Sequence, residues 1–128
     1  MTAIPPTLWS NDNSVPLTVE DAVLAIRSSR RRHIITLIEE RDEKVSVGEL
    51  AEGIAAIEAD KTISEVTSEE RKNVYIALTQ LHLETLEENG AGTYHERSKH
   101  VYTGDTTSGL AELIRHFESV CEAEAGDE

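Results

Sequence analysis

The sequence predicts a mainly helical α+β domain in which several helices are followed by a β-hairpin and one further helix. Apolar residues recur at helical spacing through most of residues 17–90. After Gly90 the pattern changes to short runs rich in Thr, Tyr and Val, and helical spacing returns near the C-terminus. Because the chain has 128 residues, 38% hydrophobic and 4% aromatic, we expect one domain with an aliphatic core.

Hydroxyl side chains mark the expected starts of the first three helices. Thr18 is placed to cap a short first helix, and Ser28 or Ser29 a second one. A polar break, "DEK", follows the second helix. Ser46 opens the third helix, and Glu49 stands three residues later, where a capping box requires an acid.

The longest helical pattern is "TSEERKNVYIALTQLHLETLEENG", residues 67–90. Thr67 and Glu70 form an expected capping box, and the Asn-Gly pair at the end is a stop signal. Turning 100° per residue places Val74, Ala77, Leu78 and Leu81 toward the core. The opposite side carries the residues Glu69, Lys72, Asn73, Ile76, Thr79, Gln80 and Leu83.

The C-terminal third predicts a hairpin and a final helix. "GTYH" and "KHVYTG" are typical of two strands joined by a polar tip. The final helix has one apolar face, which we expect to form a homodimer interface: Leu110, Leu113, Ile114, Phe117, Val120 and Cys121. Packing of this face against the helix that starts at Thr18 is the alternative.

Three helices followed by a two-stranded wing is the layout of a winged helix-turn-helix domain. A helical bundle with an accessory hairpin has the same order of elements, so the pattern leaves both open. The expected organisation is a flexible N-terminal arm (1–16), a winged helix-turn-helix domain (17–104), a C-terminal dimerisation helix (105–124) and an acidic tail (125–128).

The formal net charge of −13 has two interpretations. A polyanion ordinarily favours basic partners over nucleic acid. An acid excess spread evenly along the chain is also typical of proteins from high-salt cytoplasms. Asp and Glu occur in almost every segment, and Arg supplies eight of the twelve cations. The spread favours the second interpretation, so net charge alone does not exclude DNA binding.

Three groups of side chains are candidates for contacts with double-stranded DNA. On the long helix, Lys72, Asn73, Ile76, Thr79 and Gln80 have the chemistry to reach base edges or phosphates. Cations for the phosphate backbone are expected from the basic run and from the hairpin tip, namely Arg30, Arg31, Arg32, Arg97 and Lys99. The alternatives are a solvated helix face, arginines paired with the chain's own carboxylates, and a tip whose cations have no role.

Catalytic and metal-binding patterns are weak. Cys121 lies on an apolar helical face, the five histidines form no HxxxH-type pair, and the chain has no glycine-rich phosphate loop. We therefore expect no enzyme activity, no metal site and no cofactor. Neither a signal peptide nor an apolar run of about 18 residues is present, so the expected location is the cytoplasm, without a membrane partner.

The stretches "RRRHIITLIEE", "VSVGELAEGIAAIE" and residues 67–90 with the following hairpin resemble a domain family of unknown function found widely in salt-loving archaea. The resemblance covers roughly residues 17–104. The positions that match the family's long-helix pattern are Arg71, Lys72, Val74, Tyr75, Leu78, His82, Leu83 and Leu86, and the departures are Thr79, Leu81, Glu84 and the pair Ala91-Gly92.

The family is similar to winged helix-turn-helix transcriptional regulators. This resemblance implies DNA binding by the long helix and the wing, in a high-salt cytoplasm. We therefore expect a homodimeric DNA-binding transcription regulator. The alternative is a winged-helix protein-interaction module without DNA binding, in which Ile76 and Leu83 contact a protein partner.

Overall fold

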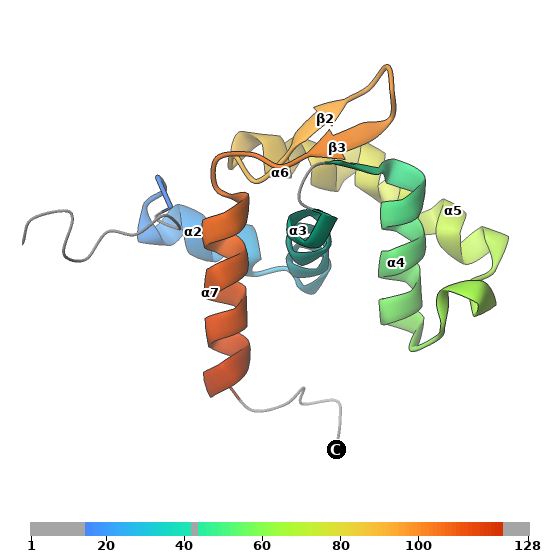
Figure 1. Ribbon diagram of the computed structural model, residues 1–128, viewed down its shortest axis with the longest axis horizontal. Helices are drawn as coiled ribbons and strands as arrows, with labels where there is room; N and C mark the ends of the chain where they lie inside the picture. The colour runs from blue at the N-terminus through green and yellow to red at the C-terminus, as the bar shows by residue number, and fades with distance from the viewer. Residues whose placement is uncertain (1–14, 42–43, 122–128) are drawn as a thin grey trace, which may run out of the picture.

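Residues 15–41 and 44–121 are described by the computed structural model, in which helices surround one core and a small sheet lies along its edge (Figure 1). The chain is thus mainly helical with an antiparallel sheet, as predicted. Its helices are α2 (Val19–Ile26), α3 (Ser29–Arg41), α4 (Val47–Ala59), α5 (Ser68–Ala77), α6 (Leu83–Glu88) and α7 (Thr107–Val120). Most of the predicted N-terminal arm and the whole acidic tail lie outside the described residues.

Side-chain caps fix the starts of the first helices. The Thr18 hydroxyl accepts a hydrogen bond from the Asp21 amide at 3.0 Å, and the Ser46 hydroxyl accepts one from the Glu49 amide at 3.0 Å. Ser28, rather than Ser29, caps α3, because its hydroxyl accepts from the Arg31 amide. Each cap satisfies an amide that has no partner inside the helix. The three predicted helix starts are confirmed to within one residue.

The long helix begins as predicted but contains a π turn. Thr67 and Glu70 form the capping box, with reciprocal hydrogen bonds of 2.9 and 3.1 Å. Between α5 and α6 the turn η2 (Leu78–His82) is a π helix, and the Leu83 amide donates to the Leu78 carbonyl five residues earlier. A π turn adds one residue to the helical repeat.

The extra residue moves the buried stripe one position along the chain. Val74 and Leu78, before and at the start of the turn, are buried as predicted. Leu81 was expected in the core but is 56% exposed, and Leu83 was expected on the outer side but is only 2% exposed. Both predictions are wrong because they assumed a constant 100° per residue across the π turn.

The sheet has three strands, one more than the predicted hairpin. β2 (Thr93–His95) and β3 (His100–Tyr102) form the hairpin, and β1 (Lys44–Ser46) pairs antiparallel with the other edge of β3, which gives the order β1-β3-β2. Val45 and Val101 lie opposite each other and are both buried. Three residues are too few for an alternating pattern to be visible, so no strand was predicted here: Lys44 was placed in the polar break "DEK" and Ser46 at the start of the third helix.

Helix α3 lies between α4 and α7, where Figure 1 shows it nearly end-on. Ile34, Ile35 and Ile38 on this helix are fully buried, whereas Leu37 is partly exposed. A short 3-10 turn, η1 (Ile63–Glu65), connects α4 to α5. No helix within residues 15–41 and 44–121 has the length and apolarity that a bilayer crossing requires.

The base of the hairpin is closed by short backbone contacts. The Thr107 hydroxyl donates to the Ala91 carbonyl at 2.7 Å and accepts from the Gly104 amide at 2.8 Å, while the Thr106 amide donates to the Gly90 carbonyl at 2.9 Å. A Cβ atom at Gly104 would overlap with the Gly90 carbonyl. The hairpin can therefore close only if residue 104 has no side chain.

We predict that Gly104→Ala lowers the free energy of unfolding, because the added methyl group forces the two ends of the hairpin apart. Overpacking of this kind costs about 1–3 kcal/mol. Gly48→Ala is the matched control, since a Cβ there meets only the Ser46 hydroxyl at 4.0 Å, and it should stabilise α4 slightly. Chemical denaturation of both variants measures the effect, and an equally stable Gly104→Ala protein would contradict it.

Candidate nucleic-acid interface

The outer face of α5 and the start of η2 present polar side chains to solvent. Lys72, Asn73, Ile76 and Gln80 are all exposed, as the helical pattern predicted. Thr79 differs, because it is half-buried and its hydroxyl donates to the Tyr75 carbonyl at 3.1 Å on its own helix. Four of the five predicted contacts on the long helix are therefore exposed, three on α5 and Gln80 on η2, and the hydroxyl of the fifth bonds to the helix backbone.

Acidic side chains near the start of α5 are partly neutralised within the chain. Lys61 donates two hydrogen bonds to the Glu70 carboxylate, at 2.8 and 2.9 Å. These bonds are the largest cause of the lowered pKa of Glu70, and a hydrogen bond from the Thr67 amide lowers this pKa further. Arg71 lies 3.6 Å from Glu52. Lys72 has no carboxylate partner among the described residues, so its charge is available on this face.

The hairpin tip is cationic and is attached to the body on both sides. The side chains of Arg97 and Lys99 are exposed. The Lys99 carbonyl accepts from the Val47 amide at 3.0 Å, and the Tyr94 amide donates to the Glu87 carboxylate at 2.8 Å. The first bond connects the tip to α4, and the second connects β2 to α6. Figure 1 shows the hairpin projecting beyond the helical body.

The three arginines at the start of α3 contact the protein itself. Arg31 donates to the carbonyls of Ala25 and Leu24 at 3.0 and 2.6 Å, and Arg32 donates to those of Ile26 and Arg27 at 2.7 and 3.0 Å. These carbonyls belong to the end of α2, where no further turn of helix supplies amide partners. Both side chains were predicted to bind phosphate, but here they cap a helix.

Arg30 is paired instead with a carboxylate. Its guanidinium forms two hydrogen bonds to Glu58 at the end of α4, at 2.5 and 2.6 Å. Donation of these hydrogen bonds to Glu58 raises the pKa of Arg30. This arrangement is the alternative that the sequence left open, in which the basic run pairs with the chain's own acids. All three guanidinium groups are thus satisfied inside the domain.

Lys44 is an exposed cation that no sequence pattern indicated. It lies on β1, opposite Tyr102 of β3. On the other side of Tyr102, the ring of His95 lies with its centroid 4.4 Å from the tyrosine ring. Lys44 therefore extends the polar surface of the hairpin across the sheet. Only the pairing of β1 with β3 places it there, and that pairing has no signal in three residues of sequence.

His82 is buried in the π turn, with 8% of its surface exposed, and its Nδ1 atom has no hydrogen-bond partner among the described residues. Burial lowers the pKa of His82, and the positive charges of Arg30 and Arg31 lower it further, while Glu58 opposes them. Burial and the two nearby cations therefore favour the neutral form of the imidazole. Regular helical spacing gave no reason to single out this residue.

The predicted dimer face of α7 is divided into two parts. Leu110 and Ile114 are buried against the chain's own core, so these two side chains are not available to a second copy. Leu113 is half-buried. Phe117, Val120 and Cys121 are exposed. The first two turns of the helix therefore close the domain, and the last turns leave an apolar surface open.

The described fold is that of a small, mainly helical α+β domain with a cationic hairpin. The chain belongs to a family of domains of unknown function, DUF7344, which it matches over residues 24–102. The match ends with β3, so α7 lies outside it. No curated protein and no solved structure matches the chain.

We predict that Arg31→Ala and Arg32→Ala each destabilise the fold by removing hydrogen bonds from the end of α2. Bonds that involve a charged group contribute about 1.5–3 kcal/mol. Arg97→Ala removes an equal charge from an exposed side chain without a partner among the described residues, and should change stability little. Denaturation curves compare the three variants, and equal losses in all three would mean that charge, not capping, matters.

We predict that acid destabilises the protein in part through His82. The unfolded chain takes up a proton near the ordinary histidine pKa of 6.5, whereas the folded chain does so only at lower pH. Between these two values the unfolded state binds more protons, so the free energy of unfolding falls as the pH falls. His82→Gln should show a shallower pH dependence from 7.5 to 5.5, and an unchanged slope in denaturation experiments would contradict the assignment.

Proposed function

We propose that the protein is a DNA-binding transcription regulator of the winged helix-turn-helix class. Helix α5 enters a major groove, and the hairpin β2–β3 contacts the adjacent backbone. The order of elements supports this class, because α3, β1, α4, α5, β2 and β3 follow one another as helix, strand, helix, helix and hairpin. In such domains the second helix of the motif reads the major groove.

The distribution of unpaired cations is the observation that carries the proposal. Among the described residues, the Lys and Arg side chains with neither a carboxylate nor a carbonyl partner are Arg27, Lys44, Lys72, Arg97 and Lys99. All but Arg27 lie on β1, α5 and the hairpin. The chain has 25 acids and 12 cations. Four of its five unpaired described cations therefore lie on β1, α5 and the hairpin, where the proposed docking places the phosphate backbone.

Base-edge contacts in this geometry come from α5 and from Gln80 in η2. Asn73 and Gln80 are exposed amides, which suit adenine, and Ile76 offers an apolar contact to a thymine methyl group. Phosphate contacts come from Lys72, Arg97 and Lys44. The three arginines of α3 support the interface indirectly, by fixing α2 and α4 to α3.

The even spread of acids supports a high-salt cytoplasm, as does the resemblance to a family of salt-loving archaea. At about 1 M salt the Debye length is only about 3 Å. Repulsion between DNA and distant carboxylates is then screened, while contacts at hydrogen-bond distance remain. The overall negative charge is compatible with DNA binding under these conditions.

A protein-interaction function is the second candidate, and one observation favours it. Ile76 and Leu81 are 40% and 56% exposed on the same long helix. Leu83, which was expected to be a protein contact, is buried and has no such role. If a protein partner covers Ile76 and Leu81, its affinity should be nearly independent of salt, whereas DNA affinity should fall steeply with salt.

We predict that Lys72→Ala and Arg97→Ala each weaken DNA binding in multimolar KCl. Removing one phosphate-binding cation should reduce the slope of log affinity against log salt by about 1. Arg97→Ala should leave the sequence preference unchanged, because a tip cation contacts backbone rather than bases. Fluorescence anisotropy on sites selected from genomic DNA measures both quantities.

Arg115→Ala is the matched control for this experiment. It removes the same charge from α7, where Arg115 lies 3.3 Å from both Glu39 and Glu112. DNA affinity should stay at the level of the unmodified protein. If Lys72→Ala and Arg97→Ala bind as tightly as Arg115→Ala, the proposed docking is wrong.

A further inference from the structure

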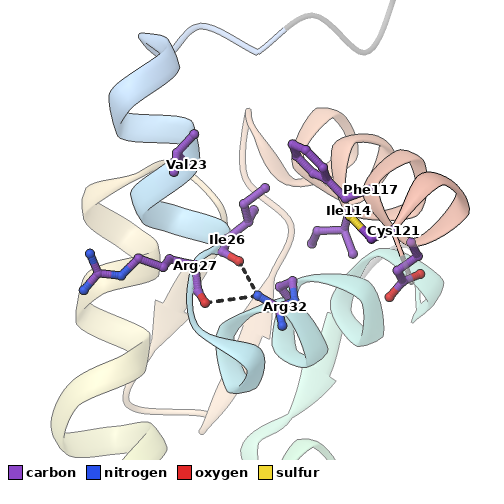
Figure 2. Close-up of a pocket in the computed structure, with 8 residues that line it drawn as sticks. Val23, Ile26, Arg27, Arg32, Ile114, Phe117 and Cys121 are labelled. Atoms are coloured by element: carbon purple, nitrogen blue, oxygen red, sulfur yellow. Dashed lines mark hydrogen bonds between the residues drawn. The ribbon is translucent and has the colours of Figure 1, made fainter. Parts of the chain in front are cut away.

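A groove of about 420 Å³ lies between α2 and α7 (Figure 2). Val23 and Ile26 of α2 form one wall, and Ile114, Phe117 and Cys121 of α7 form the other. Figure 2 shows Phe117 extending from α7 toward α2. The groove is lined mainly by apolar side chains and opens to solvent.

The apolar surface continues beyond the groove on both helices. Nine large apolar side chains are exposed among the described residues, and five of them belong to α2 or α7, namely Val19, Val23, Leu24, Phe117 and Val120. Val19 is 80% and Val120 65% exposed. Exposed apolar side chains beside an apolar groove favour a site that another surface covers.

The two rims of the groove carry opposite charges without partners. Arg27 lies at the end of α2, and Figure 2 shows its side chain pointing away from α7. Glu118 lies on α7. Neither has an ion-pair partner within residues 15–41 and 44–121. Arg32, the other cation of the lining, is already bound to the carbonyls of Ile26 and Arg27.

We propose that this groove binds the same groove of a second copy of the chain. A two-fold interface places one patch against itself, so a patch must be complementary to its own image. The α2/α7 groove meets this condition, because the two-fold axis brings Arg27 of each copy toward Glu118 of the other and buries Phe117 and Val120 between them. An interface that was acidic throughout would repel its own copy.

The segment that follows α7 is a poor alternative occupant. Its sequence, "EAEAGDE", has four acids in seven residues and no large apolar side chain. The N-terminal residues 1–14 contain the apolar side chains Ile4, Leu8 and Trp9 and are a second alternative occupant. The reactivity of Cys121, measured below, distinguishes binding of this segment from binding of a second copy. The proposed interface involves α2 and α7 alone and does not require that the protein bind DNA.

The test is the mass of the full chain, measured by light scattering over a range of concentrations in multimolar KCl. The protein should have twice its chain mass of 14.1 kDa. Phe117→Asp with Val120→Asp should give a folded monomer, because both side chains are exposed within one copy. Leu81→Asp, an equally exposed apolar site on η2, is the control and should stay dimeric.

A charge exchange then identifies the pair across the interface. Arg27→Glu and Glu118→Arg should each weaken the dimer, by about tenfold if each removes about 1.4 kcal/mol. The double exchange should restore it. The single thiol of the chain, Cys121, should react slowly with a maleimide in the dimer and rapidly in the Phe117/Val120 variant.

Three results would overturn the inference. One is an unmodified chain that is monomeric at every concentration, and a second is a dimer that survives both aspartates. The third is a monomer whose Cys121 becomes reactive only when residues 1–14 are deleted, which would assign the groove to the chain's own N-terminal segment. A monomer that still binds DNA half-sites would reject the dimer and retain the proposed function.

Discussion

The position of β3 in the centre of the sheet is the constraint on which the rest of this structure depends. β3 pairs with β2 on one edge and with β1 on the other, so the hairpin is joined to the connection between α3 and α4. Val101 on β3 faces Val45 and Tyr94 across its two edges, and its side chain is in the core. A two-stranded hairpin alone is marginal in water. Paired on both sides, the strand holds the cationic tip at a fixed place on the domain.

The π turn determines which face the long helix presents. By inserting one residue after Leu78, it turns His82, Leu83 and Leu86 inward and leaves Leu81 in solvent. The residues before the turn keep ordinary helical spacing, so Lys72, Asn73 and Ile76 share one exposed side. Most of the surface proposed to read DNA therefore lies on the regular part of the helix, and only Gln80 lies in the π turn.

Much of the fold was predictable because it follows from local chemistry. Three helices are capped through contacts within three residues, by Thr18, Ser46 and Thr67. Such local patterns can be recognised from the sequence. Features that depend on residues far apart in the chain could not be predicted from the sequence. β1 forms only because it pairs with β3. The spacing of apolar residues in the sequence does not indicate the π turn.

The candidate site was predictable to the same extent and for the same reason. The exposed side of α5 was predicted from helical periodicity. The exposed cations Arg97 and Lys99 were predicted from the hairpin pattern. The roles of Arg30, Arg31 and Arg32 were not, since a dense basic run has the same sequence whether it contacts phosphate or the carbonyls of a neighbouring helix. Only the positions of α2 and α4 relative to α3 decide between them, because Arg31 and Arg32 bind carbonyls of α2 and Arg30 binds Glu58 of α4.

Net charge is a poor guide to partners in this protein, because its cations serve two separate purposes. Arg30, Arg31 and Lys61 are held by short hydrogen bonds that join α3, α2 and α4 to their neighbours, and Arg30 and Lys61 are paired with carboxylates of the domain. The remaining free cations are few, but among the described residues all except Arg27 lie on β1, α5 and the hairpin. Where salt screens charges beyond a few ångströms, the hydrogen bonds that each cation already makes decide what it can still bind. The placement of a few unpaired side chains therefore says more about binding than the sum of −13.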